Sequence, residues 1–356
     1  MSTILLVGGA GYVGSVLAEE LLARGYAVRI LDRLYYGENG LRDIRDRVDL
    51  VRGDMRTTGA EILDGVDAVV NVGGLSNDPT AEYNPKANHE MNTVATRKLA
   101  ELCKQTGVRR YVFASTCSIY DRGVGTDHKD VLQDEASDVN PRAAYSSSKR
   151  QAELQLLSMA DENFCPVILR KGTIYGFSPR MRYDLVVNTF VKVAMSGGAL
   201  SLHYGGEMWR PLVDVRDAAR AYIACIDADE ELVRGEIFNV CFQNLRVSEL
   251  ALRVQAALRT LGVEVAIRPD YGYKGVRSYR VSAKKIERIL GIRPVVTIEE
   301  SVADMVEKIK AYGYTDFDNP RYYNIHWMRL LEEAHEVIRV TGSVFEAQEA
   351  AEPVRI

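Results

Sequence analysis

The sequence predicts an α/β fold, a doubly wound parallel sheet with a smaller, interwoven lobe toward the C-terminus. In the first half of the chain, short β-branched runs alternate with longer segments of helical periodicity, which is the pattern of successive β-α-β units. Beyond about residue 175, glycine, arginine and tyrosine are scattered through loops between short strands and helices. In such sheets the crossovers are right-handed and ligands bind at the carboxyl ends of the strands.

The elements follow in a regular order along the chain. Strands are expected at residues 3–7, 27–31, 49–52, 68–72 and 110–114. The first helix is expected at 14–24, where Gly25 closes it, and a second at 91–106, where Gly107 ends it. In the lobe we expect a strand at 238–240 and helices at 248–261 and 286–290. A last, aromatic-rich helix is expected at 322–339, followed by an Ala/Glu-rich end that is typical of disorder.

The composition excludes several classes of protein. The 356 residues carry 45 Lys+Arg against 49 Asp+Glu, without a basic stripe, so nucleic acid is not an expected partner. No apolar run approaches the ~20 residues of a membrane span. The start of the chain has no basic segment ahead of its first strand, which favours a cytoplasmic location. Five widely spaced cysteines without a CxxC pair, and five histidines without an HxH or HxxxH pair, predict neither disulfides nor a metal site.

Three glycines, Gly8, Gly11 and Gly14, join the first strand to the first helix. The first allows a tight turn, the second lets the backbone approach a pyrophosphate, and the third lets helix and strand pack closely. The positive end of the helix then faces the phosphates. Tyr12 and Val13, within the loop, belong to the same candidate site. A plain strand-to-helix turn is the alternative, but the strand and helix on either side favour a Rossmann-type dinucleotide site.

Acidic residues after the second and third strands complete this candidate site. Asp32 comes eighteen residues after Gly14, where a carboxylate can bind the adenosine ribose hydroxyls. Asp54 and Met55 follow the third strand, where they can reach the adenine. Asp32 favours NAD because it would repel a 2′-phosphate. Arg33 could instead accept that phosphate, so NADP is the less favoured cofactor; a solvated surface charge is the other interpretation of Arg33.

A second constellation is Tyr145 and Lys149, at the head of an expected helix. Four residues apart, the two side chains lie on one helical face. A phenol is a weak base at neutral pH, but a neighbouring ammonium and a positive nicotinamide ring stabilise the phenolate. A surface Tyr/Lys pair is the alternative. The hydroxyl residues Ser115 and Thr116, at the end of the 110–114 strand, favour an active site because parallel sheets deliver catalytic groups there.

Together these motifs resemble the extended short-chain dehydrogenase/reductase family, in its branch of nucleotide-sugar epimerases and dehydratases. The resemblance covers about residues 3–310 and includes the Arg210-Pro-Leu-Val-Asp214 segment. It implies that Tyr145 is the catalytic acid/base and that Thr116 binds the sugar oxygen. It also implies that Lys149 lowers the pKa of the tyrosine and holds the nicotinamide ribose. Metal is not implied.

The resemblance also implies a site for a nucleotide-diphosphate sugar. Asn188, Arg210 and Arg277 match family positions that hold the diphosphate, and a bidentate guanidinium suits phosphate. Arg180 and Arg182 are further candidates, although loop arginines are commonly solvated. The substrate-binding set is Thr116, Cys117, Ser118, Tyr145, Asn188, Arg210 and Arg277. Asn92 matches a family asparagine, for which a structural cap is an equal interpretation.

Departures from the family pattern narrow the set of reactions that the resemblance implies. Dehydratases and decarboxylases of the family carry acids just after the catalytic hydroxyl, where this chain has Cys117 and Ser118. An apolar filler is the favoured role of Cys117, and a proton-shuttling thiol the alternative. Residues 121–139 are long and charged, which suggests an active-site loop.

The sequence therefore predicts an NAD-dependent nucleotide-sugar epimerase working through a 4-keto sugar. An NAD(P)H-dependent reductase of a keto-sugar nucleotide is the alternative, and a non-catalytic dinucleotide binder the third possibility. Residues 1–175 would bind NAD and carry the catalytic groups. Residues 176–313 would form most of the substrate lobe, and 314–356 a helical extension and tail. A homodimer is expected through helices 91–106 and 145–159.

Overall fold

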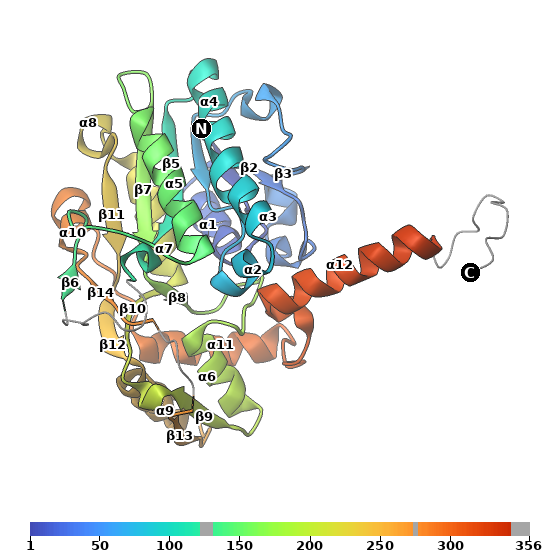
Figure 1. The fold of residues 1–356 in the computed structure, drawn as a ribbon, viewed down its shortest axis with the longest axis vertical. Helices are drawn as coiled ribbons and strands as arrows, with labels where there is room; N and C mark the ends of the chain where they lie inside the picture. The colour runs from blue at the N-terminus through green and yellow to red at the C-terminus, as the bar shows by residue number, and fades with distance from the viewer. Residues whose placement is uncertain (122–130, 273–276, 343–356) are drawn as a thin grey trace.

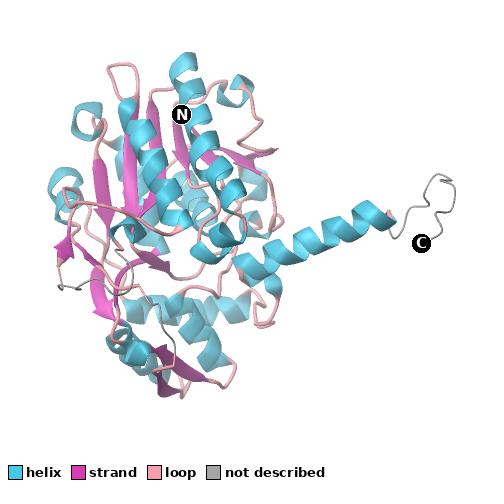
Figure 2. Cartoon of the chain, in the orientation of Figure 1, coloured by secondary structure: helices cyan, strands magenta, loops and turns pink. Residues whose placement is uncertain are grey.

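A computed structural model describes residues 1–121, 131–272 and 277–342. Its centre is a seven-stranded sheet in the order β11-β7-β5-β4-β1-β2-β3, in which all neighbouring strands are parallel. Helices cover both faces of this sheet (Figures 1 and 2). The doubly wound α/β fold expected from the sequence is thus confirmed. The strands are β1 (Thr3–Val7), β2 (Ala27–Asp32), β3 (Asp49–Arg52), β4 (Ala68–Asn71), β5 (Arg110–Thr116), β7 (Cys165–Lys171) and β11 (Ile237–Val240).

Two hydrophobic cores lie on the two faces of the sheet. One buries residues of α1 (Tyr12–Ala23) and α7 (Val215–Asp227) against β1, β2, β5 and β7. The other buries α4 (Ala95–Thr106) and α5 (Ala144–Ser158) against the opposite face. The shorter helices are α2 (Asp78–Tyr83), α3 (Pro85–His89), α8 (Glu230–Val233) and α10 (Lys284–Leu290).

The lobe has a core of its own at the carboxyl end of the sheet. It contains the three-stranded sheet β12-β10-β8 and the parallel pair β13-β9. Its strands are β8 (Thr173–Tyr175), β9 (Ala199–His203), β10 (Trp209–Asp214), β12 (Gln243–Arg246) and β13 (Ala266–Asp270). Its helices are α6 (Val186–Met195), α9 (Val247–Thr260) and α11 (Ile298–Ala311). A short pair joins β6 (Leu132–Gln133) to β14 (Arg280–Val281).

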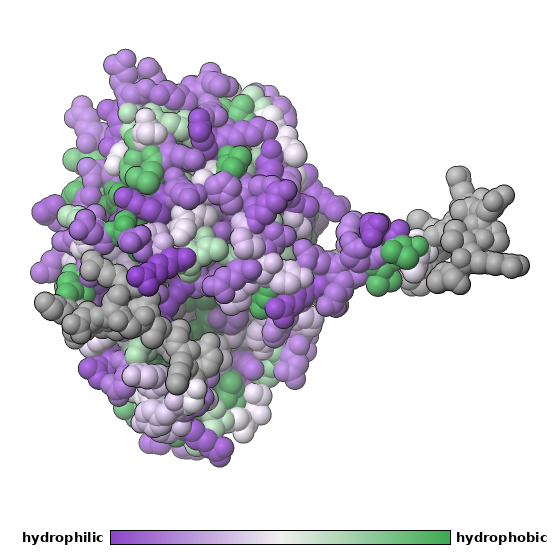
Figure 3. All heavy atoms as spheres, viewed as in Figure 1, coloured by the Kyte–Doolittle hydropathy of each residue, from purple (hydrophilic) through white to green (hydrophobic). Residues whose placement is uncertain are grey.

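The lobe is interwoven with the main sheet. After the chain has entered the lobe, α7 returns to pack on α1, and β11 adds the edge strand beside β7. The last helix, α12 (Asn324–Thr341), leaves the body and projects outward (Figure 1). Most of the face in Figure 3 is hydrophilic, but the end of α12 exposes the apolar side chains of Val337, Ile338 and Val340.

Several sequence expectations need correction. The strand β7 was missed because Pro166 interrupts its apolar run, yet β7 lies between β5 and β11. The strand β5 continues to Thr116, so the candidate hydroxyl ends the strand instead of following it. The helix expected at 91–106 begins at Ala95, after a π-helical turn at Glu90–Val94. Part of the suggested loop 121–139 and the Ala/Glu-rich end from 343 lie outside the described residues.

Candidate active site

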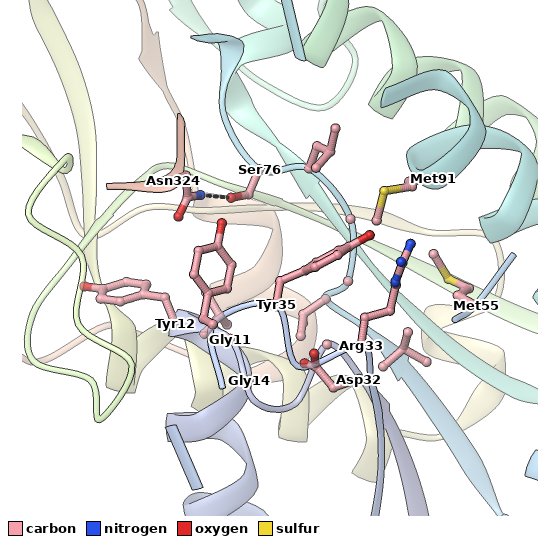
Figure 4. A pocket seen from close by; sticks show the side chains of 18 of the residues that line it. Gly11, Tyr12, Gly14, Asp32, Arg33, Tyr35, Met55, Ser76, Met91 and Asn324 are labelled. Atoms are coloured by element: carbon pink, nitrogen blue, oxygen red, sulfur yellow. Dashed lines mark hydrogen bonds between the residues drawn. The ribbon is translucent and has the colours of Figure 1, made fainter. Parts of the chain in front are cut away.

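A pocket lies at the carboxyl ends of β1, β2 and β4, where the predicted dinucleotide site was placed (Figure 4). Of the predicted cofactor residues, those that line it are Gly8, Gly11, Tyr12, Val13, Gly14, Asp32, Arg33, Asp54 and Met55. Lys149 is not among its lining residues. Further lining residues come from the turn after β4, such as Ser76, and from the start of α12.

The glycine loop has the shape that close packing requires. Gly8 has a φ of +78°, and a Cβ there would lie 2.7 Å from the Cα of Gly73. A Cβ on Gly14 would collide with the carbonyl oxygen of Gly8. A side chain at Gly8 would therefore push the loop away from the turn after β4, and one at Gly14 would push the first helix away from the loop. The loop leaves its backbone open to a bound group at the N-terminus of α1.

Two carboxylates lie in this pocket, and their pKa values are shifted in opposite directions. Asp32 accepts hydrogen bonds from the backbone N–H groups of Ala10 (3.0 Å) and Leu34 (2.8 Å). Burial raises its pKa despite these bonds. Asp54 lies between two guanidiniums, 2.8 Å from Arg33 and 2.7 Å from Arg56. Burial alone would raise the pKa of Asp54, but the arginines outweigh it and lower the pKa.

The same contacts determine what Arg33 can offer. Its guanidinium pairs with Asp54 and stacks 4.3 Å from the centre of the Tyr35 ring. Figure 4 shows Asp32, Arg33 and Tyr35 together at the pocket wall. A 2′-phosphate would have to compete with Asp54 for this arginine and would meet the carboxylate of Asp32. The donor set of the pocket therefore fits an unphosphorylated ribose.

The predicted catalytic residues come from two elements that meet at the end of the sheet. Thr116 ends β5, and its hydroxyl accepts from the backbone N–H of Ser118 (3.1 Å) and contacts the hydroxyl of Ser118 (3.0 Å). Tyr145 lies in the first turn of α5, with Lys149 one turn later on the same helix. The Lys149 ammonium lies 4.7 Å from the centre of the Phe113 ring on β5.

Burial changes the acidity of both members of the Tyr-Lys pair. Lys149 is only 3% exposed, and burial lowers its pKa to about 7, although Glu153 opposes the shift. Burial raises the pKa of Tyr145 to about 12, with a smaller opposing effect from Arg182. Without a further positive charge, the protein therefore keeps Tyr145 protonated at neutral pH.

Cys117 was expected to contact the substrate, but its side chain lies in the protein interior. It is fully buried, and its thiol donates to the carbonyl oxygen of Arg170 (3.0 Å). It packs in a small apolar cluster with Ile119 and Cys241. Burial raises the pKa of its thiol well above the usual range. The structure thus corrects the inclusion of Cys117 among substrate-contacting side chains and disfavours a proton-shuttling thiol.

Two of the predicted diphosphate ligands lie together. Arg210, on β10, donates to the backbone carbonyls of Trp209 and Arg277. The Arg277 guanidinium pairs with Asp78 and lies 3.4 Å from Asp121. Burial lowers the pKa of both arginines. The structure therefore brings these guanidiniums to one place, where a diphosphate could replace the carboxylates as counter-ion.

Asn188 uses its amide within the protein. It accepts from the backbone N–H of Gly176 (3.0 Å) and donates to the carbonyl of Arg182 (2.9 Å) and the phenol of Tyr12 (3.1 Å). It is fully buried. These contacts tie the lobe to the glycine loop and occupy the amide that was expected to contact the diphosphate. Asn92 is likewise buried, bonding both backbone groups of Leu75.

The two loop arginines that could have been solvated are instead buried in the cofactor pocket. Arg180 lies 3.6 Å from the centre of the Tyr36 ring and donates to the Asn324 side chain (2.6 Å). Arg182 forms a two-point ion pair with Asp184. Both are at most 7% exposed. Arg180 adds positive charge beside the glycine loop, while Asp184 compensates the charge of Arg182.

The C-terminal segment also reaches this pocket, which the sequence analysis missed. Asn324 donates to the hydroxyl of Ser76 (2.8 Å; Figure 4), and Trp327 donates to the backbone carbonyl of Tyr35 (2.5 Å). Asn324 and Met328 line the pocket. The cluster of aromatic residues at 322–327 indicated that this segment packs against another part of the protein, but it did not indicate which part.

The pattern of the NAD dependent epimerase/dehydratase family matches residues 4–241. The chain belongs to this family. A UDP-N-acetyl-alpha-D-glucosaminuronate decarboxylase from Bacillus cytotoxicus is 26% identical over 85% of this chain and 96% of its own length.

Solved structures of similar fold include two with different reactions. The dTDP-glucose 4,6-dehydratase DesIV from Streptomyces venezuelae, solved with NAD bound, has a TM-score of 0.75 and 27% identity over 88% of this chain and all of its own. The UDP-glucuronic acid 4-epimerase from Bacillus cereus has a TM-score of 0.75 and 21% identity, covering 87% and 99% of the two chains. The epimerase/dehydratase family is NAD-dependent, and the pocket described above fits NAD.

Other features of the described residues bear on the remaining expectations. No helix among them is long and apolar enough to cross a membrane. The five cysteines are buried and unpaired. Within residues 1–121, 131–272 and 277–342, no three His, Cys, Asp or Glu side chains gather as a metal site.

Proposed function

We propose that this protein is an epimerase of a nucleotide-diphosphate sugar that works through a transient 4-keto sugar. One observation carries the proposal. Tyr145 hydrogen-bonds to Thr116 at the end of β5, and the buried Lys149 lies against Phe113 on the same strand, while Cys117 and Ser118 stand where the family's dehydratases and decarboxylases carry acids. The groups for moving a hydride and a hydroxyl proton are present, and the usual acids for losing water or carbon dioxide are not.

Each residue then has a defined task. Bound NAD supplies the acceptor, and later the donor, of the hydride at C4 of the sugar. Tyr145 takes the proton of the C4 hydroxyl and returns it once the other face of the sugar is presented. Thr116 binds the same oxygen. Lys149 stabilises the phenolate and holds the ribose, while Arg210 and Arg277 hold the diphosphate about which the sugar turns.

Replacement of the acid/base tests this proposal. We expect Tyr145→Phe to lower turnover of UDP- and dTDP-hexoses by about 10²–10⁴-fold while NAD stays bound. Tyr271→Phe, on a residue that is 73% exposed, serves as the control and should leave turnover unchanged. Unchanged turnover in the Tyr145 variant would contradict the mechanism. Net consumption of NAD(P)H with a keto sugar would instead favour the reductase alternative.

We also propose that two copies pair through α4 and α5. Val94, just before α4, and Leu154, on α5, are each 51% exposed. Two such apolar side chains on neighbouring helices are suited to a helix-helix contact. Light scattering at micromolar concentration measures this: a mass of two chains is expected, and a mass of one chain would contradict it.

A further inference from the structure

A second lysine, which the mechanism above does not use, lies at the catalytic end of the sheet. Lys171 is the last residue of β7 and is paired in register with Thr116, the last residue of β5. Side chains two apart on a strand share a face. Residues of both strands two and four positions earlier lie in one core cluster: Val112 and Ala114, and Val167 and Leu169. Lys171 and Thr116 therefore emerge side by side on the same face.

The surroundings of Lys171 contain no carboxylate partner among the described residues. Its ammonium lies 5.8 Å from the centre of the Tyr222 ring on α7. Tyr222 is fully buried, and its hydroxyl has no hydrogen-bond partner. Burial and the charge of Lys149 lower the pKa of Lys171 to about 7, while the thiol of Cys117 opposes them.

The charges around the catalytic end do not balance. Lys149 and Lys171 are close enough to repel each other. Glu153 is the carboxylate whose charge acts on Lys149, but both of its oxygens are already bonded to Arg170, at 2.9 and 2.7 Å. NAD⁺ adds a positive nicotinamide ring. Two neighbouring ammonium groups, one buried (Lys149) and one half-buried (Lys171), are costly unless an anion enters with the ligand.

We propose that Lys171 binds a carboxylate on the sugar, so that the substrate is a nucleotide-linked uronic acid. The inference rests on the proposed function and narrows its substrate class. In a sugar whose C4 oxygen contacts Thr116, the C6 group is attached to C5, the carbon next to C4. It therefore lies within reach of the adjacent strand end. There a carboxylate compensates the two lysines, and the buried phenol of Tyr222 is a second donor nearby. A neutral hexose leaves the lysines uncompensated.

The test compares sugars that differ only at C6. The NAD-bound enzyme is given UDP-glucuronate and UDP-galacturonate beside UDP-glucose and UDP-galactose, and kcat/KM is measured for each. We expect the acids to be preferred by about ten- to a hundredfold. In Lys171→Gln this preference should fall at least about tenfold, mainly through KM, and Lys171→Arg should restore part of it. Lys310→Gln, an exposed lysine on α11, is the control and should keep the preference.

Binding separates this inference from the proposed function. Isothermal titration of the same four sugars gives the acid-to-neutral affinity ratio even if none is turned over. No turnover with a strong preference for the acids would contradict the epimerase but support the role of Lys171. Turnover of neutral sugars in preference to acids would overturn the inference and leave the epimerase standing. An equal loss for acids and neutral sugars in Lys171→Gln would also overturn it, since the lysine would then serve the cofactor.

Discussion

The buried ion pair behind the proposed catalytic residues predicts a large loss of stability when one partner is neutralised. Glu153 and Arg170 are at most 1% exposed and are joined by two hydrogen bonds, at 2.9 and 2.7 Å. Glu153 also accepts from Ser115, next to Thr116, at 2.5 Å. The carboxylate thus ties the helix that carries Tyr145 to both strands beneath it.

Glu153→Gln keeps the shape of the side chain but removes its charge. It leaves the Arg170 guanidinium buried and uncompensated, which typically costs about 3–5 kcal/mol of unfolding free energy. A chain of 356 residues has an unfolding entropy of roughly 0.75 kcal/mol/K near its midpoint, so the melting temperature should fall by about 4–7 °C. Calorimetry and urea unfolding, both with NAD in excess, measure these quantities.

Two further variants sharpen this test. Glu231→Gln, an exposed residue on α8, should change the unfolding free energy by less than about 0.5 kcal/mol. Replacing both Glu153 and Arg170 by methionine should recover much of the loss, because no charge is then left buried. A loss below about 1 kcal/mol in Glu153→Gln would refute the reasoning that the pair is dry and mutually required.

Three other predictions concern the cofactor pocket and Lys149, the lysine proposed to act with Tyr145. In Gly14→Ala, the new Cβ meets the backbone of Gly8. We therefore expect at least about 1–3 kcal/mol of destabilisation, measured by thermal unfolding. We also expect loss of co-purified NAD, measured by the absorbance of the released nucleotide. In Trp327→Ala, loss of the bond to the Tyr35 carbonyl should speed NAD release about tenfold in a chase experiment, and an unchanged rate would show that the C-terminal segment does not retain the cofactor. Lys149→Met tests the lowered lysine pKa: between pH 7 and ~10.4 the unfolded chain binds a proton that the folded chain does not, so the stability of the native protein rises with pH in this range. The advantage of the methionine variant in unfolding free energy should therefore shrink by up to about 4 kcal/mol from pH 6 to pH 10, and a pH-independent difference would contradict the shift.

The sequence was sufficient to predict features that depend on the local geometry of the backbone. Gly8 and Gly14 were assigned correctly to tight turning and close packing, because a glycine loop between a strand and a helix leaves few other conformations. Tyr145 and Lys149 could be paired from their spacing alone, since a helix places residues four apart on one face.

Long-range contacts could not be read in the same way. Nothing near Asn188 in the sequence indicates that its amide bonds to Tyr12, 176 positions away. Lys171 was missed because the strand that carries it is interrupted by Pro166, so its pairing with Thr116 was not foreseen. Cys117 follows Thr116, the candidate catalytic hydroxyl, in sequence, yet a turn at the end of β5 directs its thiol into the protein.

The most direct test of the central claim follows the hydrogen at C4. UDP- and dTDP-linked hexoses and hexuronates carrying deuterium at C4 are incubated with the NAD-bound enzyme, and the products are analysed by NMR. We expect a sugar inverted at C4 that retains the deuterium there, with no net change in NADH absorbance. A product that has lost carbon dioxide or water, or a stoichiometric change in the cofactor's redox state, would contradict it.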